Sequence, residues 1–265
     1  MTNPRSLALM LFGACLLVVG AAQAGQPLET ESARLMKRAT FKVEGGFERQ
    51  TSAAGTEFAT PFAFEASLTD RLELTIEPVA YTAIRDKGTR RQVGQGDLEV
   101  TLTSLLRDER GGLPALALAA EVKLPTARNN RIGTGKTDYS LSLLASKHAR
   151  AWDTHANVGY TIIGKPAGVV ANNTMSFAVA EELRVSPGFV VVGEVFGSTA
   201  AVGESGAEGA APSAESQLTP ELSGGEIVAA LGLQMHAARG MTYSVGLSID
   251  GNRAVLVHPG ISIAF

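Results

Sequence analysis

The sequence holds a single cysteine and, after its first 24 residues, no long apolar run. Cys15 lies within that leader, so a chain cleaved after Ala24 has no thiol for a disulfide bond or a thiolate metal site. No later segment offers the roughly 20 consecutive apolar residues that a membrane-spanning helix needs. These absences exclude a disulfide-stabilised domain and a helical membrane protein.

Basic residues are also scarce relative to acidic ones. The chain has 23 Lys and Arg residues against 26 Asp and Glu residues, which gives a net charge of −3. Nucleic-acid binding draws on a surplus of basic residues, so we expect no nucleic-acid partner.

The first 24 residues are typical of a secretory signal peptide. Arg5 precedes an apolar stretch, and Ala22-Gln23-Ala24 provides the small-x-small pattern of a cleavage site. One alternative is a membrane-anchoring helix, but the apolar stretch is shorter than a bilayer span. The other is a lipoprotein cleaved before Cys15, whose preceding residues match a lipobox poorly. We therefore predict export and cleavage near Ala24.

Apolar and polar residues alternate through almost all of residues 41–265. Every second residue from Met241 to Ile249 is apolar, and those between are polar or small. About twelve segments follow this pattern, each near the ~9–11 residues of a transmembrane strand. They are residues 41–49, 57–68, 71–83, 96–106, 114–125, 138–147, 153–164, 174–184, 188–197, 226–237, 241–249 and 255–265. Short links alternate with longer ones, which predicts an all-β fold: a transmembrane antiparallel up-and-down β-barrel.

The strand faces that would point into this barrel carry many ionisable residues. Ten candidate lumen-lining residues are Glu44, Glu65, Glu73, Glu99, Glu121, Lys123, His155, Glu182, Glu194 and His258. A periplasmic β-sandwich, the main alternative, would bury these groups at roughly several kcal/mol for each one left unpaired. A wet lumen keeps them hydrated, which favours the barrel. Residues 25–40 would be a short periplasmic segment, and the sequence leaves open whether residues 26–38 enter the lumen.

The last predicted strand ends on the aromatic residue Phe265, which is typical of an outer-membrane barrel. We expect the outer membrane of a Gram-negative bacterium as the location. The expected partners are outer-membrane lipids and the barrel-assembly machinery, which would bind this terminal strand. Trp152 would anchor the periplasmic interface, and Tyr139 and Tyr160 the outer one.

Three positions depart from the regular alternation. Pro259 lies within the last strand and cannot donate a ladder hydrogen bond. Glu181 has lipid-facing parity, and Tyr81, a further candidate for an interfacial anchor, has inward parity. Pro259 and Glu181 predict local bulges or register shifts, and the inward parity of Tyr81 makes it the weakest of the candidate anchors.

Seven short stretches, taken in their order and spacing, resemble a known family. They are VEGGF at 43–47, LTDRLEL at 68–74, GQGDLEV at 94–100, LAAEVKLPT at 118–126, GTGKTDY at 133–139, NVGY at 157–160 and VGEVF at 192–196. Together they resemble the outer-membrane barrel family of the MetA pathway of phenol degradation. The resemblance implies a transporter of small, aromatic or hydrophobic molecules, and it brings no catalytic residues.

No residue pattern indicates an enzyme, a metal site or a cofactor. The stretch GTGKT at 133–137 lacks the earlier glycine of a phosphate loop, because Asn130 stands in that position. None of the four histidines is placed for a lipase-like or protease-like site on a barrel. We therefore expect no cofactor, no metal ion and no enzymatic activity.

The leading functional hypothesis is an outer-membrane channel for small molecules. Inward acids outnumber inward bases, so an open pore should prefer cations. One alternative is a path for hydrophobic substrates that opens sideways at a seam marked by Pro259 and by Gly45-Gly46. Another is a closed barrel with a structural or surface-interaction role that displays residues 198–225. The sequence assigns no particular substrate.

Overall fold

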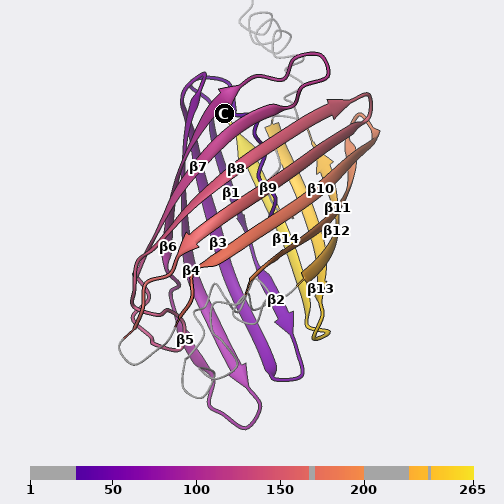
Figure 1. Cartoon of the computed structure of the whole chain (residues 1–265). Coiled ribbons are helices and arrows are strands. Elements are labelled where there is room, and N and C mark those ends of the chain that lie inside the picture. Colours follow the sequence, from indigo (N-terminus) through magenta and orange to yellow (C-terminus); the bar gives the residue numbers. More distant parts are fainter. Residues whose placement is uncertain (1–27, 167–170, 200–226, 238–239) are drawn as a thin grey trace, which may run out of the picture.

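Period-two alternation produces fourteen antiparallel strands that hydrogen-bond into one sheet. The computed structural model describes residues 28–166, 171–199, 227–237 and 240–265 (Figure 1). The strands are β1 (Phe41–Gly46), β2 (Glu48–Thr51), β3 (Gly55–Thr69), β4 (Leu72–Asp86), β5 (Gln92–Gly94), β6 (Leu98–Arg107), β7 (Ala115–Leu124), β8 (Asp138–Ala149), β9 (Trp152–Ile162), β10 (Thr174–Ser186), β11 (Phe189–Ser198), β12 (Ile227–His236), β13 (Met241–Asp250) and β14 (Val255–Ala264). The predicted signal peptide and nearly all of the predicted loop at 198–225 lie outside the described residues.

The sheet closes on itself because β1 pairs with β3 on one side and with β14 on the other. The fourteen elements form twelve wall strands, since β1 continues into β2, and β5 into β6, after short interruptions. The closed antiparallel barrel of about twelve strands that the alternation predicts is confirmed. Within the described ranges, no helix is long and apolar enough to cross a membrane.

The interruption between β1 and β2 has its cause in Pro259 on β14. The Phe47 N–H donates to the Pro259 carbonyl at 3.2 Å, but proline has no N–H to donate in return. The register is the same on both sides of the break, with Gly46 opposite Gly260 and Arg49 opposite Val257. The seam is therefore paired on both sides of Pro259, and the proline causes no register shift.

A β-bulge in β4 explains the orientation of Tyr81. Thr60 pairs with Tyr81 and Pro61 pairs with Val79, so Ala80 is an extra residue in β4. An extra residue reverses the side-chain parity of the strand beyond it. Tyr81 consequently lies on the outer surface with 36% of its surface exposed. The inward parity obtained by counting along the strand is therefore wrong.

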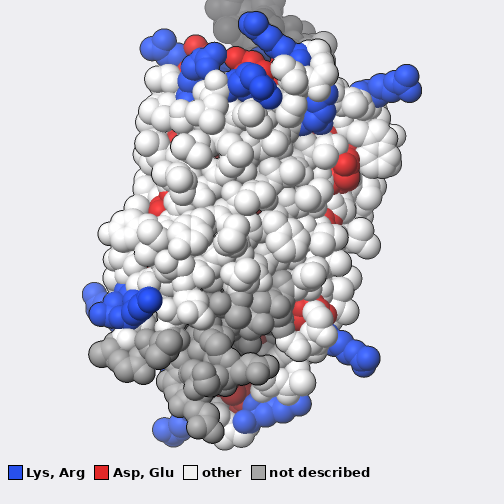
Figure 2. Space-filling model, in the orientation of Figure 1, with Lys and Arg blue, Asp and Glu red and all other residues white. Residues whose placement is uncertain are grey.

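The outer face of the wall is apolar. Large side chains such as Leu231 and Ile227 on β12 are 68% and 63% exposed, and exposed leucine, valine and aromatic side chains surround the barrel. Figure 2 shows that Lys and Arg on the face in view gather toward the two ends of the molecule. Such a continuous apolar surface suits a lipid environment.

The two ends of the barrel differ in their connections. The short-turn end carries links 70–71, 108–114, 150–151, 187–188 and 237–240, whereas the long-loop end carries links 52–54, 87–91, 125–137, 163–173, 199–226 and 251–254. Both the start of β1 and the end of β14 lie at the short-turn end. There Phe41 and Phe265 exchange backbone hydrogen bonds of 3.3 and 2.8 Å.

A charge placed at the middle of the outer face should destabilise the barrel more than a charge at its edge. We expect Leu231→Arg to lower the free energy of unfolding in lipid vesicles by about 2–4 kcal/mol, because the arginine must enter the hydrocarbon. The control Ile227→Arg, at the long-loop end of the same strand, should cost less than about 1 kcal/mol. Urea unfolding curves measure both changes, and equal losses would contradict a lipid-facing belt.

Candidate functional site

Residues 28–38, which we call the strap, lie inside the barrel up to Met36 and reach the exposed short-turn end at Lys37 and Arg38. Residues 28–32 and Arg34 line the same internal cavity as side chains from β1, β4, β7 and β14. The strap turns into β1 at Ala39, whose φ of 61° is a left-handed conformation that side chains disfavour. The sequence leaves open whether residues 26–38 enter the lumen, and polar groups of the wall hold the described residues of this segment up to Met36 in the lumen.

Two wall side chains hold the first residues of the strap. The Glu194 carboxylate on β11 accepts hydrogen bonds from the backbone N–H groups of Glu29 (3.1 Å) and Thr30 (2.6 Å), and from the Thr30 hydroxyl. The Asn157 amide on β9 donates to the Glu31 carbonyl at 3.0 Å and accepts from the Glu31 N–H at 2.6 Å. The wall thereby satisfies backbone groups that an extended segment cannot pair with itself.

Small side chains on β7 leave room for the middle of the strap. Ala33 is fully buried in a cluster with Ala115, Ala117, Ala119 and Leu144. Its N–H donates to Ser146 Oγ on β8 at 2.8 Å. Near the start of β1, the Met36 N–H donates to Glu73 Oε2 at 2.9 Å, and its carbonyl accepts from Ser67 Oγ at 3.0 Å. The strap therefore has partners on several separate wall strands.

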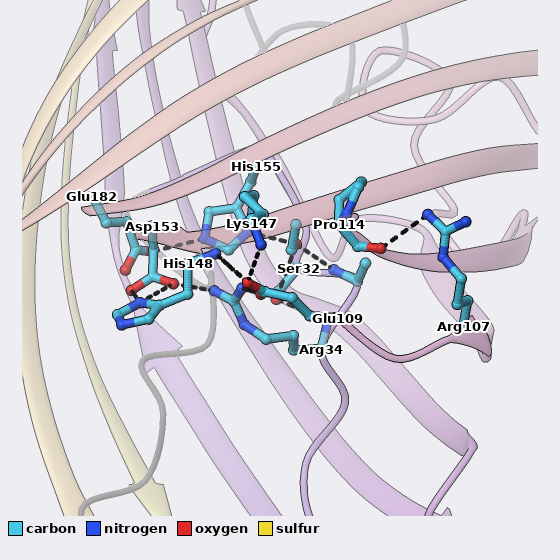
Figure 3. Close-up of polar contacts among 12 residues, drawn as sticks. Ser32, Arg34, Arg107, Glu109, Pro114, Lys147, His148, Asp153, His155 and Glu182 are labelled. Atoms are coloured by element: carbon cyan, nitrogen blue, oxygen red, sulfur yellow. Dashed lines mark hydrogen bonds and ion pairs between the residues drawn. The ribbon is translucent and has the colours of Figure 1, made fainter. Parts of the chain in front are cut away.

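Arg34 ties the strap to two carboxylates near the short-turn end (Figure 3). Its guanidinium lies 3.2 Å from Glu109 Oε2, in the turn after β6, and also pairs with Asp153 on β9. Lys147 Nζ lies 2.7 Å from Glu109 Oε1, and His148 Nδ1 lies 3.1 Å from Asp153 Oδ1. These five side chains form one network, which we call the Arg34 network.

Glu109 is ionised in this network. Its slight burial would raise the pKa, but hydrogen bonds from Lys147 and the His148 N–H, together with the charges of Lys147 and Arg34, hold the pKa below its ordinary value. A lowered pKa means that the contribution of Glu109 is fully present above its ordinary pKa and is lost as the pH falls through the lowered value. The Arg34 network is therefore intact at neutral pH.

Ser146, His155 and Glu182 form a buried row behind the strap. His155 Nδ1 lies 2.8 Å from Ser146 Oγ, and His155 Nε2 lies 3.9 Å from Glu182 Oε1. The row has the residue types of a nucleophile, a base and a carboxylate. All three side chains are at most 1% exposed, and the Ser146 hydroxyl oxygen already accepts a hydrogen bond from the Ala33 N–H. We interpret the row as an anchor for the strap.

An acid-rich cavity of about 490 Å³ remains beside the strap. Nine glutamates line it: Glu29, Glu31, Glu44, Glu48, Glu65, Glu73, Glu77, Glu99 and Glu121. Among the described residues that line it, Arg34 is the one Lys or Arg. Glu77 and Glu99 lie directly opposite each other on β4 and β6. This lining gives the cavity a negative potential.

Six of the ten lumen residues predicted from the sequence line this cavity: Glu44, Glu65, Glu73, Glu99, Glu121 and His258. The other four face inward elsewhere. Lys123 pairs with Asp138 at 2.5 Å, His155 and Glu182 lie behind the strap, and Glu194 holds the strap. No group of three His, Cys, Asp or Glu residues within the described ranges is arranged to hold a metal ion.

Further residues of the wall, outside the ten candidates, shape the site. Lys42 Nζ lies 3.1 Å from Glu44 and 2.7 Å from Glu65, so it offsets two of the cavity acids. Ser146 and Asn157 bind the strap backbone. The signal that could have located the strap is the run of inward alanines on β7, because such small side chains leave part of a twelve-stranded lumen unfilled.

A family model described as "Putative MetA-pathway of phenol degradation" matches residues 24–223. The chain belongs to this family. The resemblance carried by the seven short stretches is thus confirmed. No curated protein matches the chain.

Solved outer-membrane barrels share the fold of this family member at low sequence identity. The NanC porin has a TM-score of 0.59 and 9% identity, over 84% of this chain and 98% of that chain. The KdgM porin in complex with disordered oligogalacturonate has a TM-score of 0.56 and 8% identity, over 84% and 99%. The translocator domain of autotransporter NalP from Neisseria meningitidis has a TM-score of 0.51 and 10% identity, over 86% and 88%. At these identities the likeness shows the fold alone.

Loss of the Arg34 network should loosen the strap. A cysteine introduced as Ser32→Cys reports this, because Cys15 is the chain's only native cysteine and precedes the predicted cleavage site. With Arg34→Gln we expect the reporter to react roughly fivefold to tenfold faster with a polar maleimide, since charged hydrogen bonds worth about 1–1.4 kcal/mol are lost.

The control for this experiment is Arg107→Gln. Arg107 donates to the Pro114 carbonyl at 3.1 Å near the same end of the barrel, and it forms no hydrogen bond or ion pair with the described strap residues (Figure 3). Equal labelling rates in the two variants would show that Arg34 does not hold the strap.

The strap should also loosen as the pH rises. Burial, followed by the charge of Glu194, raises the pKa of Glu29 to about 8. Burial, followed by the charge of Glu121, raises the pKa of Glu31 to about 7. The other acids that raise these pKa values are Glu48, Glu65, Glu73 and Glu77. Glu29 and Glu31 therefore bind protons more tightly in the docked strap than in a free strap. Docking is strongest below pH 4.5, the ordinary pKa, and weakens as the pH rises to about 8, the raised pKa of Glu29.

Labelling of the Ser32→Cys reporter measures this change. Its rate should be divided by the rate of an exposed cysteine at Thr89→Cys, which corrects for thiol ionisation. We expect the ratio to rise between about pH 5 and about pH 8. A flat ratio would mean that Glu29 and Glu31 do not control docking.

Proposed function

We propose that this protein is an outer-membrane channel for small molecules, without enzymatic activity. The observation that carries the proposal is the acid-rich cavity of about 490 Å³ inside a closed barrel of the outer-membrane type. In this proposal the long-loop end faces the outside of the cell and the short-turn end faces the periplasm. Membrane lipids and the barrel-assembly machinery, through the strand ending in Phe265, are its partners.

The charge of the lumen supports a preference for cations. Nine glutamates and one arginine line the cavity, and above about pH 8, where Glu29 and Glu31 are ionised as well, such a lining concentrates cations. The KdgM porin was solved with oligogalacturonate, which is a polyanion. The acid-rich cavity described above would repel such a molecule.

The family description links this chain to phenol degradation, so we extend the proposal to small aromatic solutes. The cavity lining combines carboxylates with hydroxyl groups such as Thr75 and Ser140, and with the apolar side chains of Ala178 and Phe196. Polar groups set among apolar ones are typical of sites for small organic molecules. Neutral or cationic aromatic compounds fit both the lining and its charge.

Three aromatic solutes of similar size test the charge preference: benzylamine, benzyl alcohol and benzoate. After the uptake of protein-free liposomes is subtracted, we expect protein-dependent uptake in the order cation, neutral compound, anion. Glu77→Gln with Glu99→Gln removes the facing pair of acids and should reduce the ratio of benzylamine to benzoate uptake by roughly fivefold. Faster uptake of benzoate than of benzylamine would contradict the proposal.

The control for this measurement is Glu181→Gln on β10. Glu181 accepts hydrogen bonds from Thr154 Oγ1 at 2.9 and 3.0 Å, and its parity places it on the outer face of the wall. It carries the same chemical change outside the lumen, so its uptake ratio should match that of the parent protein.

The strap favours a second candidate, a closed barrel without transport, because it occupies part of the lumen. Deleting the strap, residues 28–38, discriminates between the channel and the closed barrel. A channel gated by the strap should show an increased single-channel conductance in planar bilayers after the deletion. If the parent and the deletion variant are both silent, the barrel is closed and its role is structural.

A further inference from the structure

Basic side chains crowd one sector of the long-loop end. Seven exposed bases come from the end of β4 and from links 87–91 and 125–137: Arg85, Lys87, Arg90, Arg91, Arg128, Arg131 and Lys136. Arg49 on β2, which β3 separates from β4, is exposed as well. The segments touch, since Arg131 in link 125–137 lies 3.7 Å from Asp86 Oδ2 at the end of β4. The bases therefore belong to one surface.

Carboxylates do not balance this surface. Among the described residues, Arg131 alone of these eight bases forms an ion pair, with Asp86 at 3.7 Å. Asp97 is only 2% exposed, and Asp138 is buried against Lys123. Within the described ranges, this surface therefore carries a surplus of positive charge.

An aromatic shelf adjoins these bases on the outer face of the wall. The rings of Phe47 and Phe58 stack with their centroids 6.0 Å apart, and Tyr81 meets Phe58 edge-on at 6.3 Å. Arg49 pairs with Phe58 in the β2–β3 register, and Arg91 donates to the Tyr81 hydroxyl at 3.0 Å. Guanidinium groups and aromatic rings thus lie side by side.

The order of these groups along the barrel axis is that of a membrane interface. Arg85 pairs with Thr56, which lies two residues closer to the long loops than Phe58. Moving from the long loops toward the middle of the wall, a ligand would meet Arg85 first, then Arg49 and Arg91 beside the aromatic rings, and then the apolar belt. A lipid presents its groups in the same order: charged headgroup, interface, acyl chains.

We propose that Arg49, Arg85 and Arg91, together with the shelf of Phe47, Phe58 and Tyr81, bind a phosphorylated lipid of the surrounding leaflet. Guanidinium groups match phosphate because they offer several donors in a planar fork. The acyl chains of the lipid would lie against the shelf and the belt. A soluble anion would use the arginines but would leave the shelf uncovered, so a lipid fits the whole surface. The site does not depend on transport through the lumen.

Native mass spectrometry of the purified barrel in detergent tests the proposal. The probes are bis-phosphorylated lipid A, its dephosphorylated form and glucosamine 6-phosphate. We expect the parent protein to retain both lipids, but the phosphorylated lipid at a concentration about tenfold lower, or less, than the dephosphorylated one requires. Arg49→Gln with Arg85→Gln and Arg91→Gln should abolish this preference.

The control is a triple variant with the same loss of charge at the short-turn end: Arg38→Gln with Arg110→Gln and Arg150→Gln. These residues are also exposed, and the control should keep the full preference. If the first triple variant fails to form a heat-modifiable barrel, Arg91→Gln alone serves, with an expected loss of roughly threefold.

Two outcomes would overturn the proposal. An unchanged preference for the phosphorylated lipid in the Arg49, Arg85 and Arg91 variant would show that the phosphate binds elsewhere. Equal retention of glucosamine 6-phosphate and the phosphorylated lipid would show a site for soluble anions, with no role for the aromatic shelf.

Discussion

The constraint on which this fold depends is that lipid offers no hydrogen-bond partner to a peptide group. A strand facing hydrocarbon must pair along both edges, so the sheet has to close, and the pairing of β1 with β14 closes it. At Pro259 the backbone pairing along this seam departs only slightly from a regular ladder. One donor is missing there, Phe47 still donates to the proline carbonyl, and the register continues unchanged on both sides.

Much of this wall could be predicted from the sequence, because a strand that faces lipid on one side and water on the other alternates apolar and polar residues. The strand limits come close to those observed: β8, for example, ends at Ala149, two residues beyond the expected end. The predicted orientation of Tyr81 is wrong because the bulge at Ala80 depends on how β3 and β4 pair. Counting residues along β4 alone cannot reveal that pairing.

The candidate site also has a part that the sequence predicts, the inward acids of the wall, and a part that it does not, the strap. Parity alone puts Glu65 and Glu121 on the inner face, because position in a strand fixes the direction of a side chain. The strap has no period, and its partners are remote: Thr30 and Glu194 are 164 residues apart in sequence. Only the folded barrel brings them together. The acids are consequently of two kinds, those that repel one another around the cavity and those, such as Glu194 and Glu73, that accept backbone hydrogen bonds from the strap.

The turn at Ala39 joins two features that have been treated separately. It lies two residues before Phe41, which pairs with Phe265 at the seam, and its N–H donates to the Ser67 carbonyl on β3 at 3.1 Å. The point where the strap bends inward is therefore fixed to the two strands that flank the first strand of the barrel. The bend that leads into the strap and the closure of the ring are held by neighbouring hydrogen bonds, so a newly folded barrel would fix the course of its internal segment as it becomes a ring.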